Sequence, residues 1–225
     1  MAMERQKVYY SFHDIPYQES TWSSPSVPPK MRFSKTEIQH IIIAIGVLTI
    51  AFAFAFTPNG LVNIMGVISN IPLSFFAIFT AFFCHELAHK YMGMKYGYWS
   101  EFRMFPQGLL LALILGVLLG VVFAAPGAVQ IYGNPNRDQY GKISAAGPTV
   151  NLIIAVLFLP VFIVFRGSLL GYIANFISFI NTFLALFNLL PFGPLDGMKV
   201  FRWRKEVWIG LFAAGIALFI VLLLF

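Results

Sequence analysis

The sequence predicts an all-α polytopic membrane protein with five or six transmembrane helices and a short membrane-associated β-hairpin. Of its 225 residues, 59% are hydrophobic and only 11% are charged, whereas soluble domains carry about 25% charged residues. A soluble protein of this composition could not cover its surface with polar groups. The net charge of +6 comes from basic residues beside apolar runs, which is typical of positive-inside topology. We therefore expect a lipid bilayer as partner and no nucleic acid, while the oligomeric state is not predicted.

The N-terminal residues 1–37 are predicted to form a polar cytosolic tail, and residues 38–225 a membrane domain. The tail is rich in proline and serine, and its polarity excludes a cleavable signal peptide. Ser34 and Glu37 fit a capping box, with Ser34 as the N-cap. The first membrane-spanning helix, predicted at 38–56, would then be an uncleaved anchor.

Five further apolar segments follow the first. They cover residues 71–92, 108–125, 144–165, 168–190 and 207–225, and they have about the length that a membrane-spanning helix needs. Between two of them, residues 126–143 combine a β-branched and aromatic run with an Asn-Pro-Asn turn, which predicts the β-hairpin. The single cysteine, Cys84, excludes an intrachain disulfide and a cysteine-rich zinc site.

The second apolar segment contains an H-E-x-x-H pattern, His85-Glu86-Leu87-Ala88-His89. Ionisable side chains at bilayer depth are costly and mark functional sites, and these are the only histidines beyond residue 40. His85 and His89 lie on one face of a helix, where they can bind one tetrahedral Zn²⁺. Glu86 is turned away from them by about 100°. It is therefore placed to act as the general base rather than as a metal ligand.

A catalytic zinc site takes a third protein ligand. The long zincin form needs glycine at 92 and histidine at 95, but the chain has Met92 and Lys95. Only five acidic residues lie beyond residue 60, and they are Glu86, Glu101, Asp138, Asp196 and Glu206. Glu101 and Glu206 lie among basic residues beside helix ends, and Asp138 lies in a polar turn. Asp196 follows an apolar span in a proline-rich break, and such breaks at membrane depth line cavities, so it is predicted as the third ligand of one zinc per chain.

The paired motifs resemble those of the site-2 protease family of intramembrane zinc metalloproteases (peptidase family M50). The first motif is H-E-x-x-H in a transmembrane segment, and the second is Asn188-Leu189-Leu190-Pro191-Phe192-Gly193-Pro194-Leu195-Asp196-Gly197. The segments "AGPTVN" (146–151) and "PGAVQIYG" (126–133) resemble further elements of the family, so the resemblance covers about residues 71–200. It implies cleavage of transmembrane segments of other proteins, with zinc held by His85, His89 and Asp196 and with Glu86 as base. It also implies that Asn188 positions the substrate or stabilises the oxyanion, and it makes Asn151 a candidate substrate-binding residue.

The charge pattern predicts how the two motifs meet. The tail contains five basic residues and the loop before the second span contains no charge, so the N-terminus is expected in the cytosol and the active site near the cytosolic face. If 108–125 were a full span, Asp196 would lie on the opposite side from His85. We therefore expect this segment to be re-entrant or tilted. The alternative is a true span, with the chain crossing back within residues 126–133. In either case the apolar segment 108–125 departs from the family pattern.

The substrate is expected to be a transmembrane protein or peptide that unwinds and pairs with the strand at 128–133 by strand addition. The candidate substrate-binding residues there are Gly127, Val129 and Ile131, and Gly127 and Gly133 would permit close approach. Two alternatives are an integral-membrane protease of the gluzincin type and a non-enzymatic zinc-binding or zinc-transport protein. The first needs a glutamate ligand in a downstream apolar span, which the chain lacks. The second would carry polar residues along several helices.

Overall fold

The computed structural model describes residues 31–122 and 126–224, so most of the predicted tail lies outside the described residues. Within these ranges, five helices are long and apolar enough to cross a membrane, and they are Lys35–Ala55, Ile64–Lys95, Arg137–Val164, Leu169–Asn188 and Lys205–Leu224. One two-stranded antiparallel sheet accompanies them. The predicted fold class is therefore confirmed, with five spans.

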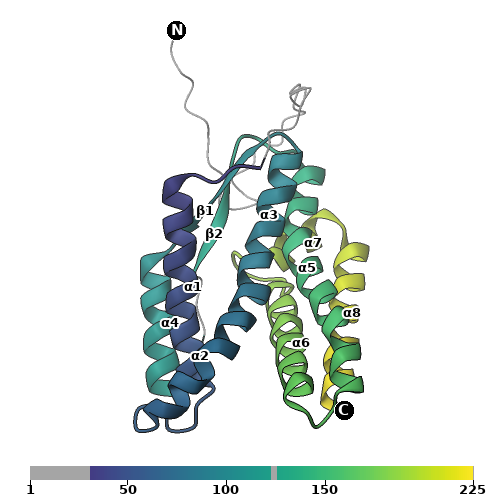
Figure 1. Ribbon diagram of the computed structural model, residues 1–225. Helices are drawn as coiled ribbons and strands as arrows, with labels where there is room; N and C mark the ends of the chain where they lie inside the picture. Colours follow the sequence, from purple (N-terminus) through teal and green to yellow (C-terminus); the bar gives the residue numbers. More distant parts are fainter. Residues whose placement is uncertain (1–30, 123–125, 225) are drawn as a thin grey trace.

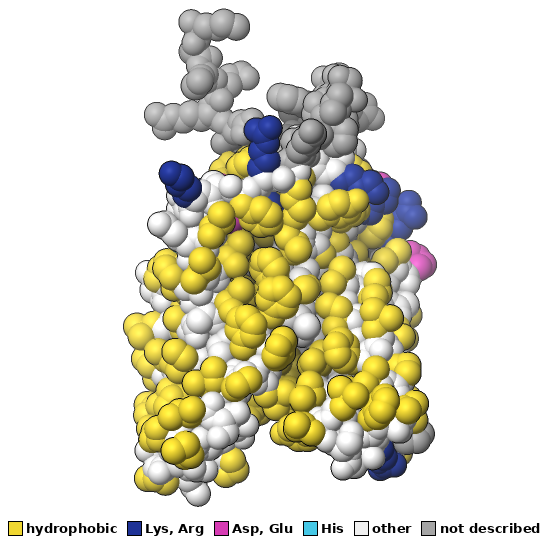
Figure 2. All heavy atoms as spheres, viewed as in Figure 1, with side chains coloured by type: hydrophobic (Ala, Val, Ile, Leu, Met, Phe, Trp, Pro, Cys, Tyr) yellow, Lys and Arg dark blue, Asp and Glu magenta, His cyan; other side chains and the backbone are white. Residues whose placement is uncertain are grey.

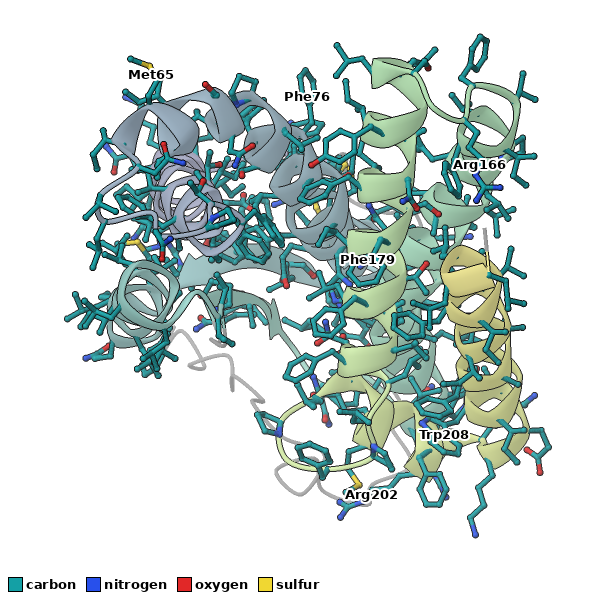
Figure 3. All side chains as sticks on the ribbon, turned by 90° about the horizontal axis from the view of Figure 1, so that it is seen from below. Met65, Phe76, Arg166, Phe179, Arg202 and Trp208 are labelled. Atoms are coloured by element: carbon teal, nitrogen blue, oxygen red, sulfur yellow. The ribbon has the colours of Figure 1, made fainter. Side chains whose placement is uncertain are left out.

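The helices form two groups with the metal-motif helix between them (Figure 1). Helices α1 (Lys35–Ala55) and α4 (Pro106–Leu119) lie on one side; α5 (Arg137–Val164), α6 (Leu169–Asn188) and α8 (Lys205–Leu224) lie on the other. Between them run α2 (Ile64–Ile78), the π-helical turn η2 (Phe79–Phe83) and α3 (Cys84–Lys95) as one span. In Figure 3, α1 and α4 are seen nearly end-on while α6 and α8 are not, so the two groups are inclined to each other.

Apolar side chains cover most of the visible flank, while charged side chains collect towards one end (Figure 2). Many large hydrophobic residues on the spanning helices are exposed, such as Ile42, Leu157 and Leu224. In water this surface would be unfavourable, but lipid tails are a suitable solvent for it. The distribution fits a multi-pass membrane protein.

The start of α1 differs from the predicted capping box. The Ser34 side chain caps the helix by accepting from the Glu37 amide, as predicted. The Glu37 carboxylate, however, is fully buried and accepts two hydrogen bonds from the Lys90 ammonium, at 2.9 and 2.7 Å. It also accepts from the Phe102 amide, while Lys90 donates to the Ser100 carbonyl. One buried ion pair thus joins α1, α3 and the sheet.

Breaking this ion pair is expected to destabilise the protein strongly. Lys90→Met would leave the Glu37 carboxylate buried without its cation, which typically costs about 3–5 kcal/mol. The double variant Glu37→Leu/Lys90→Met removes both charges and is expected to recover most of the loss. Unfolding titrations in detergent would measure both, with the exposed Lys95→Met as control. A single-variant loss below about 1 kcal/mol, the range of surface pairs, would contradict the prediction.

The predicted strand exists, but its partner differs from the prediction. Strand β2 (Gly127–Tyr132) pairs antiparallel with β1 (Trp99–Met104), in the register Phe102 with Val129. The expected return strand after the Asn-Pro-Asn turn is instead the start of α5. Asn136 and Gln139 form a capping box there, in which each side chain accepts a hydrogen bond from the backbone amide of the other residue. These hydrogen bonds favour the start of a helix.

Residues 105–126 leave the sheet and return to it at the same place, because Met104 pairs with Gly127. Helix α4 has 14 residues, or about 21 Å, which is less than the hydrocarbon thickness of about 30 Å. It packs on α1, where a Cβ at Gly116 would lie 2.6 Å from the Ala51 carbonyl oxygen. A simple full span is therefore excluded for α4, as the predicted position of Asp196 requires. Residues 123–125 of this segment lie outside the described residues.

Candidate metal centre

Three predicted metal ligands, His85, His89 and Asp196, come together in the interior. The histidines lie one turn apart on α3, and Asp196 is the first residue of α7 (Asp196–Trp203), which follows α6. The Asp196 Oδ2 atom lies 3.2 Å from His85 Nε2 and 3.0 Å from His89 Nε2. All three side chains are buried. Residues 111 positions apart thus present three donor atoms to one point.

The chemistry of these donors fits a bound cation. His89 Nδ1 lies 2.8 Å from the Ile143 carbonyl oxygen, so this nitrogen carries the hydrogen and Nε2 of the neutral ring presents its lone pair. That lone pair faces a carboxylate oxygen, which is also an acceptor. Two acceptors at 3.0 Å need a proton or a cation between them. A tetrahedral zinc site with bonds of about 2.0–2.2 Å separates its donors by about 3.3 Å, close to the distances observed.

Gly147 on α5 closes the cluster from the side opposite α3. A Cβ at this position would lie 2.6 Å from His85 Nε2, and closer still to His89 Nε2. Only a residue without a side chain therefore lets α5 approach the two donor atoms. The glycine is the first residue of the Gly-Pro pair in "AGPTVN", a segment that suggested the family without giving this residue a role.

Gly147→Ala is expected to weaken zinc binding at least about tenfold, the lower range for losing an outer-shell contact, because the new methyl group would displace the imidazoles. Chelator competition would measure the affinity. The matched control is Gly210→Ala on α8, where a Cβ meets nothing within 4 Å, so affinity should stay unchanged. Equal affinities for the two variants would show that the Gly147 contact is not needed.

The loop between α6 and α7 positions Asp196. Leu189, at the end of α6, is fully buried, and its carbonyl accepts a 2.7 Å hydrogen bond from the Trp208 indole. Gly197 lies against the Leu189 and Leu190 carbonyls, where a Cβ would collide with both. The glycine of the Asp-Gly pair thus lets α7 begin tightly against the end of α6. This tight turn directs the preceding Asp196 carboxylate inward.

Lys199, one turn along α7, completes the electrostatics of Asp196. Its ammonium lies 3.1 Å from Asp196 Oδ1, the oxygen that does not face the histidines. Burial raises the pKa of the Asp196 carboxyl, but the proton between this carboxylate and His89 and the charge of Lys199 outweigh burial and hold that pKa well below its usual range. Burial lowers the pKa of Lys199, yet the Asp196 carboxylate raises it overall. Asp196 is therefore an anionic donor at neutral pH.

Glu86 lies outside the three-residue cluster and faces the sheet. Its Oε2 atom accepts a 3.0 Å hydrogen bond from the Val129 amide of β2. In the register of the sheet Val129 is opposite Phe102, and the Phe102 amide is directed outward to Glu37. The two residues thus form a non-hydrogen-bonded pair, so the Val129 amide lies on the free edge of β2. A carboxylate next to the metal cluster therefore meets an open strand edge.

Comparison with known proteins identifies the chemistry. A protein of Methanocaldococcus jannaschii named "Putative zinc metalloprotease" is 41% identical over 194 residues, covering 84% of this chain and 97% of that relative. The chain belongs to this zinc metalloprotease family. A second protein of that organism, named "Zinc metalloprotease", is 31% identical over 129 residues, which are 57% of this chain and 33% of that relative. A Bacillus subtilis protein named "Putative zinc metalloprotease" is 27% identical over 154 residues, covering 59% of this chain and 69% of the relative.

No protein-family model and no solved structure matches the chain. The cofactor of the metalloprotease is Zn²⁺, and His85, His89 and Asp196 form a group that could hold it. Two of the acidic residues that the sequence did not favour as ligands have other partners: Glu101 pairs with Arg103, and Asp138 pairs with Lys142.

The other predicted site residues lie near the metal helix without joining the cluster. Asn188 ends α6, and its amide donates to the Leu184 carbonyl of its own helix at 3.1 Å, so a role at the oxyanion requires the side chain to rotate. Asn151 is fully buried and donates to the Ala81 carbonyl. Gly127 has a φ of 153°, and a Cβ there would lie 2.5 Å from the Arg103 carbonyl oxygen. The need for glycine at 127 therefore comes from β1.

An apolar cavity of about 740 Å³ lies on another side of α3, between α3, α5 and α8. Cys84, Ala88, Val150 and Leu211 are among its lining residues, and the three metal-cluster residues are not. Glu86 is not among the lining residues either. It is hydrogen-bonded instead to the Val129 amide of β2.

Proposed function

We propose that the chain is an intramembrane zinc endopeptidase of the site-2 protease type (peptidase family M50), which hydrolyses peptide bonds within or near transmembrane segments. The observation that carries the proposal is the hydrogen bond from Val129 to Glu86 beside the metal cluster. Glu86, His85 and His89 lie on a helix long and apolar enough to cross a membrane, and the open edge of β2 and the Asp196 carboxylate of α7 meet them there.

The residues of the chain divide the chemistry among them. Bound Zn²⁺ would act as a Lewis acid and favour the attack of water at neutral pH. His85, His89 and Asp196 would hold it, and the Ile143 carbonyl would fix the tautomer of His89. Glu86 would take the proton of the attacking water and pass it to the leaving amine. Asn188 would donate its amide to the substrate or to the developing oxyanion.

The free edge of β2 supports the predicted strand addition. Backbone groups of alternate residues point to the same edge of a strand, so Gly127, Val129 and Ile131 share the edge on which Val129 meets Glu86. A substrate segment that unwinds there would exchange its own carbonyl for the Glu86 carboxylate on the Val129 amide. This exchange would release Glu86 for proton transfer. Asn151, predicted as a further substrate contact, has its amide nitrogen engaged with the metal helix.

The orientation follows from charge. The ends of α3, α5 and α8 on the side of the cluster carry Lys95, Arg137 and Lys205, whereas Arg166 follows the opposite end of α5. By the positive-inside rule, the cluster end would face the cytosol. Residues 1–37 would form a cytosolic tail, and the protease core would comprise about residues 71–200.

Cleavage of membrane segments is the test of substrate class. Protein reconstituted in liposomes is expected to cut a panel of single-span peptides, and to leave soluble unfolded peptides of equal length intact. Mass spectrometry of the products would locate the cut within or beside the apolar segment. Preferential cleavage of the soluble peptides would favour the gluzincin alternative, and zinc binding without any cleavage would favour the non-enzymatic alternative.

Val129→Pro is expected to lower cleavage at least about tenfold while zinc content and the fold stay unchanged. Proline removes the amide hydrogen that faces Glu86, and its place on the free edge spares the pairing with β1. Val129→Ala retains the amide and serves as the matched control. If Val129→Pro cleaves single-span peptides at the wild-type rate, strand addition at this edge is wrong.

A further inference from the structure

The helix that carries the zinc motif is interrupted just before the motif. In η2 the amide of Cys84 donates to the carbonyl of Phe79, five residues earlier, instead of four as in an α-helix. Single π turns of this kind are energetically unfavourable and are found mostly at functional sites. The turn therefore needs a stabilising environment, and its effect on the histidines can be worked out.

The π turn aligns the histidines with the buried face of α2. Ala77, Ala81, His85 and His89 are spaced by four and are 0%, 1%, 3% and 8% exposed. In an uninterrupted α-helix, the twelve residues from Ala77 to His89 would turn the side chain by about 120° from the starting face. One π turn accommodates an extra residue and removes about 100° of this rotation. The two side chains then differ by about 20°, so both face the interior.

Asn151 on α5 stabilises this turn from one side. Its Nδ2 atom donates a 3.1 Å hydrogen bond to the carbonyl oxygen of Ala81, in the middle of η2. A change from five-residue to four-residue spacing leaves a helix carbonyl without its amide donor, and such groups need a partner when buried. Asn151 supplies a donor within the turn from a neighbouring helix.

Asn181 on α6 stabilises the same turn from a second side. Its Nδ2 atom donates to the hydroxyl of Thr80 at 3.0 Å, and Thr80 donates to the Phe76 carbonyl at 2.9 Å. Both Asn181 and Asn151 are fully buried. Helices α2 and α6 are in contact, and they can be found in Figure 3 by the labels of Phe76 on α2 and Phe179 on α6. Consecutive residues of η2 are thus held by side chains from two different helices.

The carbonyl oxygens of both amides are buried and have no hydrogen-bond partner among the described residues. Leaving such an acceptor unpaired is costly, so these asparagines are poor choices for packing alone. Their amide nitrogens, in contrast, both donate to η2, and that of Asn181 donates also to the Ile177 carbonyl of its own helix. A leucine has the same number of side-chain heavy atoms and would leave no unpaired acceptor at either position. The hydrogen bonds that the two amide nitrogens donate to the π turn therefore explain why asparagine stands at positions 151 and 181.

We propose that Asn151 and Asn181 are positioning residues that hold the π turn and thereby direct His85 and His89 to the zinc. The two amides act on the metal through the helix rather than by contact with substrate. This inference rests on the proposed function only in taking the histidines as ligands. It gives Asn151 a role different from the substrate contact that the sequence suggested.

The test uses Co²⁺ as an optical probe in the full-length protein, without reference to proteolysis. Asn151→Leu and Asn181→Leu are each expected to weaken Co²⁺ binding at least about tenfold, the lower range for outer-shell partners, and to alter the visible spectrum of the bound ion. Asn175→Leu on α6 is the matched control, since the Asn175 side-chain oxygen is likewise unpartnered among the described residues, and none of the hydrogen bonds that hold η2 comes from Asn175. Its spectrum should equal that of the wild type.

Deleting Phe79 makes the test specific. Removal of one residue converts the π turn into an α-helix. His89 then follows Ala77 by eleven residues instead of twelve, and eleven α-helical residues turn the side chain by about 20° beyond three full turns. His85 and His89 therefore stay on the same face. In this background Asn151→Leu should change Co²⁺ affinity less than about threefold, since no carbonyl of the turn then needs a donor. This rescue would not occur if Asn151 acted through packing or through direct contact with substrate.

The outcomes separate cleanly. A tenfold loss in Asn151→Leu that disappears in the Phe79 deletion supports the proposal. Unchanged Co²⁺ affinity and spectrum in both asparagine variants would overturn it while leaving the metal site intact. An equal loss with and without Phe79 would also overturn it, because the role would then be independent of the turn. Failure of the wild type to bind Co²⁺ would overturn the metal site and this inference together.

Discussion

Glu86→Gln is expected to retain zinc and to lose cleavage by about 10²–10⁴-fold, the usual contribution of a general acid–base group. Glutamine has nearly the same shape and can still accept a hydrogen bond from the Val129 amide. It cannot take a proton from water, so the chemical step fails while the site stays assembled. Metal analysis and single-turnover cleavage of a membrane-segment peptide, measured on the same preparation, would separate the two effects.

Glu206→Gln is the matched control for this prediction. Glu206 lies at the exposed start of α8 and outside the metal cluster, so its neutralisation should change neither zinc content nor rate. Full activity of Glu86→Gln would rule out Glu86 as the base. Loss of zinc from Glu86→Gln would instead give Glu86 a part in metal binding, against its position facing β2.

The group of residues that could hold a metal ion could be predicted because the surrounding sequence is so apolar. In a soluble helix, histidine and glutamate have many uses; in a membrane span each is costly, so His85, Glu86 and His89 stand out. The same scarcity of acids singled out Asp196. The expectation that residues 108–125 leave and return on one side also followed from charge, and the pairing of Met104 with Gly127 provides the geometry.

Features that depend on tertiary contacts could not be predicted in this way. The strand partner was missed because β1 precedes β2 by a whole helix, whereas the Asn-Pro-Asn turn is a strong local signal. Glu37 was assigned to a local capping box, although its carboxylate binds Lys90, 53 residues away. The π turn has no hydrophobic period of its own, so nothing in "FTAFF" distinguishes it from an α-helix. Gly147 likewise needs the positions of two imidazoles to be understood.

Asp196→Ala is expected to abolish stoichiometric zinc binding. The substitution removes one of three donor atoms and the negative charge that would balance the metal. The loss of affinity should exceed the roughly 10–100-fold that outer-shell partners contribute. Metal analysis after dialysis against a weak chelator would detect it, with one zinc expected per wild-type chain. Cleavage should then fall with zinc content, unlike in Glu86→Gln, which keeps its metal.

The control for this prediction must show that the fold survives. Asp138→Asn also neutralises a paired aspartate, the partner of Lys142 at the start of α5, and it should keep one zinc per chain.

Lys199→Met tests the other oxygen of the Asp196 carboxylate: Asp196 would remain a donor but lose the ammonium at 3.1 Å. An intermediate zinc affinity is therefore expected, between wild type and Asp196→Ala. If Asp196→Ala bound zinc as the wild type does, the third ligand would have to be another group, and the tight turn at Gly197 would need a different explanation.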